Sequence, residues 1–177
     1  MKDDFTGPGI FTRDPLPAGT CVLTVPQTLV LHPQMCRARI ESALSCKSAE
    51  LLYSHDWIIL YLILHRILKD LQSRVTDDLL KHKPYVQILP DIILTPLQFM
   101  PAELALLEGT SLLKNANARL SRTSSAAQCA KSWVKSNLTE SCDPAIVAIN
   151  AIIQDEAAWL THWRWASSIY SRYALHF

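Results

Sequence analysis

The segment covering residues 159–173 restricts the fold of this chain more than any other stretch. Three of the five tryptophans lie within it, so it holds a large share of the apolar surface that folding must bury. Its apolar residues follow two lines at helical spacing: Trp159, Trp163, Ala166 and Tyr170 on one, and Trp165, Ile169 and Tyr173 on the other. A helix that is apolar on two sides needs neighbours on both sides.

Length and composition predict one soluble globular domain. The chain has 177 residues, of which 49% are hydrophobic and 19% charged, and its formal net charge is +1. Folding a chain of this length buries roughly 70% of the surface that the unfolded chain exposes. The longest apolar run covers residues 57–64, far short of the roughly 20 residues that a bilayer requires. The balanced charge gives no argument for a membrane or a nucleic acid as partner.

The amino terminus and the cysteines indicate an intracellular protein of the cytoplasm or nucleus. Residues 1–5 lack the apolar run of a secretory signal. The five cysteines are odd in number and include no C-x-x-C pair, so they suggest neither a complete disulfide framework nor a zinc site. No metal is expected, and a reducing compartment fits this cysteine usage.

Residues 9–31 predict a small β meander of two or three strands. The β-like runs cover residues 10–13, 20–25 and 28–31, and the prolines and glycine of residues 14–19 predict a turn between the first two. So few short strands do not form a stable sheet alone. They must therefore pair with strands outside this sequence or lie against helices.

From Gln34 onward, the pattern is helical. Helices are predicted over residues 35–43, 54–72, 101–109, 111–138 and 145–153, and in the tryptophan-rich segment. Residues 111–138 fit one long helix or two short ones, and residues 145–153 fit a separate helix or one continuous with the tryptophan-rich segment. Four prolines argue against a long helix over residues 83–100, and the acidic pair Asp77-Asp78 is predicted to lie in a loop.

Four blocks of sequence together resemble a known family. They are G-P-G-I-F-T-R-D-P-L-P-A-G-T-C-V-L-T-V-P-Q-T-L-V-L at residues 7–31, K-P-Y-V-Q-I-L-P at 83–90, E-L-A-L-L-E-G-T-S-L-L at 103–113, and W-R-W-A-S-S-I-Y-S-R at 163–172. In this order and spacing they resemble the SET-domain methyltransferases. The chain is most similar to the branch that includes the Rubisco large-subunit lysine methyltransferases and relatives acting on other non-histone proteins.

The resemblance implies an α+β fold that is mostly α. Residues 1–33 would be the first strands of a partial SET domain, residues 34–158 its inserted helical subdomain, and residues 159–177 a helix leading into the SET core. In the family, the asparagine-histidine motif, the catalytic tyrosine and the strands around them follow this helix, and no residue here matches them. We therefore expect the far side of the tryptophan-rich helix to be partly exposed in this chain.

The resemblance also implies a cofactor, S-adenosylmethionine. The family's opening glycine loop holds it partly through backbone groups, and the matching residues are Thr6, Gly7, Pro8 and Gly9. The arginine that closes the tryptophan-rich helix also reaches the cofactor, and its match is Arg172. A guanidinium suits this role because it offers a rigid fork of donors to a carboxylate such as the methionine tail.

The function expected from this resemblance is that of a truncated SET-family protein-lysine N-methyltransferase. Its substrate would be a non-histone protein, and the isolated chain would be inactive because the catalytic half is absent. The alternative is a non-catalytic helical module that binds a protein or a polyanion. It would use the basic residues between Gly109 and Thr139, which are Lys114, Arg119, Arg122, Lys131 and Lys135.

Overall fold

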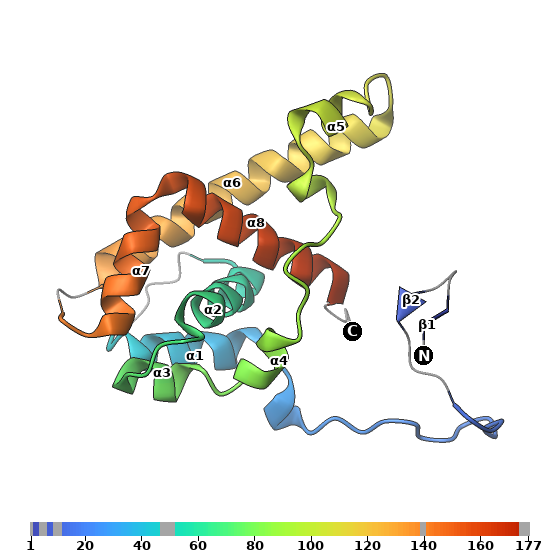
Figure 1. Cartoon of the computed structure of the whole chain (residues 1–177), viewed down its shortest axis with the longest axis horizontal. Helices are drawn as coiled ribbons and strands as arrows, with labels where there is room; N and C mark the ends of the chain where they lie inside the picture. The colour runs from blue at the N-terminus through green and yellow to red at the C-terminus, as the bar shows by residue number, and fades with distance from the viewer. Residues whose placement is uncertain (1, 4–6, 9–11, 47–51, 139–140, 174–177) are drawn as a thin grey trace. The chain divides into compact units, whose positions relative to one another are not determined.

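Figure 1 shows a computed structural model of the chain, which divides into two compact units, residues 1–30 and residues 31–177. The structure describes residues 2–3, 7–8, 12–46, 52–138 and 141–173. The two units are described separately below.

The first unit contains little regular structure. Strand β1 (Lys2–Asp3) pairs with β2 (Gly7–Pro8) in an antiparallel ladder of two residues each. Residues 12–26 form turns and irregular backbone, and the 3-10 helix η1 (Gln27–Leu29) follows. All side chains of residues 12–30 are exposed, so this unit has no core among its described residues.

The predicted α+β fold class is therefore wrong, because the described part of the chain is all-α apart from this short ladder. Residues 20–25 are irregular, and the run predicted over residues 28–31 contains η1; residues 10 and 11 lie outside the described ranges. Their β-branched side chains favour a strand only where a neighbouring strand supplies cross-strand contacts. Within the described ranges no strand pairs with residues 20–25, and Val22, Leu23 and Val25 stay exposed. The boundaries predicted at residues 33 and 158 stay predictions.

The second unit is a set of helices packed around α2. Its described helices are α1 (Pro33–Ala43), α2 (Ser54–Leu68), α3 (Arg74–Leu79), α4 (Lys83–Gln87), the 3-10 helix η2 (Pro96–Gln98), α5 (Pro101–Ala105), α6 (Ser111–Asn137), α7 (Pro144–Gln154) and α8 (Glu156–Tyr173). Helix α2 contacts α1, α4, α6, α7 and α8 (Figure 1). The helices predicted from periodicity are confirmed. Helix α3, which contains Asp77, replaces a predicted loop.

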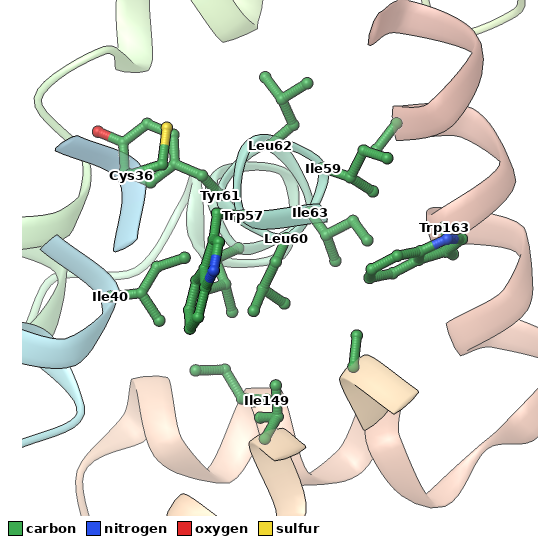
Figure 2. Packing of buried hydrophobic residues seen from close by; sticks show 14 of the residues in the cluster. Cys36, Ile40, Trp57, Ile59, Leu60, Tyr61, Leu62, Ile63, Ile149 and Trp163 are labelled. Atoms are coloured by element: carbon green, nitrogen blue, oxygen red, sulfur yellow. The ribbon is translucent and has the colours of Figure 1, made fainter. Parts of the chain in front are cut away.

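Helix α2 is apolar around its whole circumference, and so it lies at the centre of the core. In Figure 2 its side chains point outward on several sides, toward Ile40 of α1, Ile149 of α7 and Trp163 of α8. A helix of this kind is stable in water only when other elements surround it. The buried residues of α2 are Asp56, Trp57, Ile59, Leu60, Tyr61, Leu62, Ile63, Leu64, His65 and Leu68.

Two aspartates decide where the last helices begin. The Asp143 carboxylate accepts a hydrogen bond from the Ala145 N–H at 2.8 Å, which caps α7. The Asp155 carboxylate accepts one from the Ala158 N–H at 3.0 Å at the start of α8. Because Asp155 has extended backbone angles, α7 and α8 are two helices rather than one, whereas residues 111–137 form one long helix.

The tryptophans of α8 are buried, so the partial exposure expected for the far side of this helix is wrong. The exposed fractions of Trp159, Trp163 and Trp165 are 1%, 0% and 3%. The indole N–H of Trp159 donates to the Ala127 carbonyl of α6 at 2.8 Å. On another side, the indole N–H of Trp165 donates to the Pro90 carbonyl at 2.9 Å. The second neighbour of α8 is thus the irregular segment before η2, which the chain itself supplies.

We expect Trp163→Ala to lower the free energy of unfolding by about 3–5 kcal/mol, because it leaves a large cavity between α8 and α2. Urea denaturation followed by circular dichroism measures this. The control is Leu106→Ala, at a side chain that is 84% exposed, with an expected change under about 0.5 kcal/mol. Equal effects of the two substitutions would contradict the packing described here.

Candidate functional site

The residues predicted to bind S-adenosylmethionine fall in different parts of the chain. Gly7 and Pro8 form β2 in the first unit, and Thr6 and Gly9 lie outside the described residues. Arg172 lies in the last turn of α8, is exposed, and makes no hydrogen bond or ion pair with another described residue. This set of residues stays a prediction.

The basic residues of α6 do not share one face. At 3.6 residues per turn, Lys114, Arg119, Arg122, Lys131 and Lys135 point to different sides of the helix. Two of them hold α6 against α8: Lys131 pairs with Glu156, and Arg119 donates to the Ser171 hydroxyl. Two of these five cations therefore contribute to helix packing.

A charged cleft of about 180 Å³ lies between the end of α2, helix α4 and Trp165 of α8. The guanidinium of Arg66 stacks over the Trp165 ring, with its central carbon 4.3 Å from the ring centroid. Its Nη2 lies 3.5 Å from an Asp91 carboxylate oxygen. Burial lowers the pKa of Arg66, and the Asp91 carboxylate opposes that shift. Stacking and pairing together fix Arg66 as one wall of the cleft.

The other charges of this cleft leave an excess of positive charge. Lys69, Lys83 and Asp70 line it, and none of them has an ion-pair partner among the described residues. Arg66 and Asp91 neutralise each other, so two lysines face one carboxylate. The cleft therefore favours an additional negative charge.

An exposed apolar edge continues from this cleft, and we define it as Ile88, Ile92 and Leu94. Their exposed fractions are 79%, 80% and 80%, whereas Ile93 between them is only 4% exposed. The edge and the cleft are continuous because Asp91 lies within this segment and lines the cleft. Three large apolar side chains exposed within so short a segment make a candidate interaction surface.

The apolar edge is fixed to α8 at two points. Trp165 donates to the Pro90 carbonyl, as described above, and the hydroxyls of Thr95 and Ser168 are hydrogen-bonded at 2.7 Å. The buried side chain of Ile93 adds an apolar anchor. The segment therefore has a defined position although it contains no helix or strand.

Polar groups buried beside the cleft hold helices together. His65 Nδ1 lies 3.0 Å from the Tyr61 carbonyl, which can only accept, so this nitrogen carries the proton. The Tyr61 hydroxyl lies 3.0 Å from the Leu79 carbonyl and 2.9 Å from His82 Nδ1. It donates to the carbonyl and accepts from His82, because a hydroxyl has one proton. The two bonds of the Tyr61 hydroxyl join α2 to the ends of α3 and α4, whereas the His65 bond lies within α2.

Sequence reasoning missed the apolar edge, although Ile92 and Leu94 stand between Pro90 and Pro96. Apolar residues in a short run are usually buried, and only the packed structure distinguishes the exposed ones from Ile93. Within the described ranges, hydropathy gives no helix that could span a bilayer, and no three His, Cys, Asp or Glu residues are grouped to hold a metal ion.

Comparisons with protein families, with curated proteins and with solved structures found no match for this chain.

We expect the free energy of unfolding to fall by about 3 kcal/mol between pH 6.5 and pH 4 through His65 alone. Burial lowers the pKa of His65 from 6.5 to about 4 in the folded chain. The unfolded state then binds a proton at His65 more readily than the folded state does. The contribution of His65 to the free energy of unfolding is therefore present above pH 6.5 and is lost as the pH falls. Urea unfolding at several pH values measures the slope.

The matched variant is His65→Gln, which removes this titration and should have a smaller slope than the unsubstituted chain over the same pH range. Identical slopes for the two proteins would contradict a buried, neutral His65.

Proposed function

We propose that this chain is by descent part of a SET-family, S-adenosylmethionine-dependent protein-lysine N-methyltransferase, and that it acts as a non-catalytic helical interaction module. The order and spacing of the four sequence blocks support the descent. The block at residues 163–172 lies within one helix, α8, which agrees with its helical position in that family.

The non-catalytic part of this proposal rests on the structural roles of the buried titratable groups. Tyr61 and His82 hold α2 against α3 and α4, His65 bonds to the Tyr61 carbonyl within α2, and an Asp56 carboxylate oxygen accepts a hydrogen bond from the Tyr53 N–H at the start of α2. Methyl transfer to an amine needs a neutral nucleophile held in line with the methyl donor. Half of the residues that line the cleft described above are charged, which favours binding over methyl transfer.

The described residues include only part of the predicted S-adenosylmethionine site, because Thr6 and Gly9 lie outside them. Arg172 offers a free guanidinium that suits a carboxylate, but Arg172 does not line the cleft beside Trp165. In the opening loop, Pro8 has no backbone N–H to donate. We therefore propose that the chain alone does not bind this cofactor tightly.

The direct test is to incubate the purified chain with radiolabelled S-adenosylmethionine and a mixture of non-histone proteins. We expect no labelled protein, and calorimetry should give a dissociation constant of about 1 mM or weaker. The calorimetric control is Arg172→Gln, which should bind no differently. Methylation of any protein would refute the non-catalytic role, and micromolar binding lost in Arg172→Gln would refute the proposed lack of affinity.

A protein partner is favoured over a polyanion. The cations of α6 are spread around that helix and partly bonded to α8, whereas Ile88, Ile92 and Leu94 expose three large apolar side chains within a short segment. Polyanion binding depends strongly on salt, because it releases counterions. Heparin binding that weakens steeply between two salt concentrations would therefore favour the polyanion role.

A further inference from the structure

We propose that the apolar edge and its adjoining cleft bind an extended strand of a protein partner, apolar at alternate positions and carrying a carboxylate at the end nearer the cleft. This inference rests on the interaction role proposed above and goes beyond it by specifying the surface and the chemistry of the ligand.

The backbone of residues 91–94 is available for strand pairing. The N–H groups of Asp91, Ile92, Ile93 and Leu94 donate no hydrogen bond to any described residue. The side chains of Ile92, Ile93 and Leu94 alternate between solvent and core, as the side chains of a half-buried strand do. Unpaired backbone groups in such a run form a template for a further strand.

The run is short, and its end is defined. The Thr95 N–H donates to the Ile93 carbonyl at 2.9 Å, a tight turn around Leu94 that occupies this carbonyl and ends the run before η2. A partner strand can therefore pair with only a few residues, and the exposed side chains of Ile92 and Leu94 must contribute to its affinity by apolar burial.

The charge of the cleft determines which kind of side chain the partner strand carries at its end. Asp91 is the first residue of the run. Its ion pair with Arg66 reduces the repulsion between Asp91 and a second carboxylate. Lys69 and Lys83 lie in the same cleft without ion-pair partners, against the single carboxylate of Asp70. A partner carboxylate placed here is attracted by the two lysine ammonium groups.

A second copy of this chain fits less well than a partner with this chemistry. An identical edge would bring another positive cleft beside the first, and like charges disfavour such pairing. A nucleic acid would contact the cations of the cleft, but it would leave the exposed isoleucines and leucine without an apolar partner.

The probe is a fluorescein-labelled peptide of alternating valine and threonine that ends in two glutamates. Its binding to the full chain is measured by fluorescence anisotropy. Ile92→Asp should weaken binding at least about tenfold by placing a charge in the apolar contact. The control Leu106→Asp, at an equally exposed position outside the edge, should change binding less than about twofold.

Two further measurements test the backbone and the charge. Peptide addition should slow amide hydrogen exchange within residues 91–94, which a contact through side chains alone would not do. Lys83→Glu should weaken binding of the peptide that ends in two glutamates and strengthen binding of a peptide that ends in two lysines. Lys114→Glu should do neither.

The proposal is overturned if the peptide does not bind, if Leu106→Asp weakens it as much as Ile92→Asp, or if the amides of residues 91–94 exchange unchanged. Self-association of the chain in sedimentation that Ile92→Asp abolishes would assign the edge to a second copy and would also overturn it. Methyl transfer by the chain would refute the proposed function and leave these binding results unaffected.

Discussion

The burial of α2, in which ten of fifteen residues are buried, is the constraint on which the rest of the structure depends. Its apolar run at residues 57–64 has no hydrophilic side, so α1, α4, α6, α7 and α8 must surround it. Burial also extends to Tyr61, whose hydroxyl then needs partners inside the protein. Those partners lie in and beside α3 and α4, and this requirement holds the two short helices next to the cleft.

The helical part of the fold could be predicted from the sequence because its signals are local. Apolar spacing gave α2, α6 and α8, and the pair Asp143-Pro144 agrees with the observed start of α7. The strands predicted within residues 9–31 failed because β-branched residues form a strand only with a partner. The full burial of Trp165 could not be predicted either, because its cover is an irregular segment that has no periodicity.

The candidate site was less predictable than the fold. Family resemblance directed attention to the opening glycine loop and to Arg172, and these residues stay predictions. The apolar edge can be recognised only in the packed structure. Ile92 and Ile93 are the same residue type, but the first is exposed and the second is buried. The cleft likewise depends on Arg66 and Trp165, which are 99 positions apart in the chain and meet only when α8 packs beside α2.

The central claim is that the helical unit closes its core with its own residues and needs no additional strands to cover the tryptophans. Iodide quenching of the tryptophan fluorescence of the native chain tests this most directly. All five tryptophans are at most 4% exposed. The structure therefore predicts blue-shifted emission and little quenching until the chain is unfolded. Emission and quenching like those of indole in water, under native conditions, would contradict it.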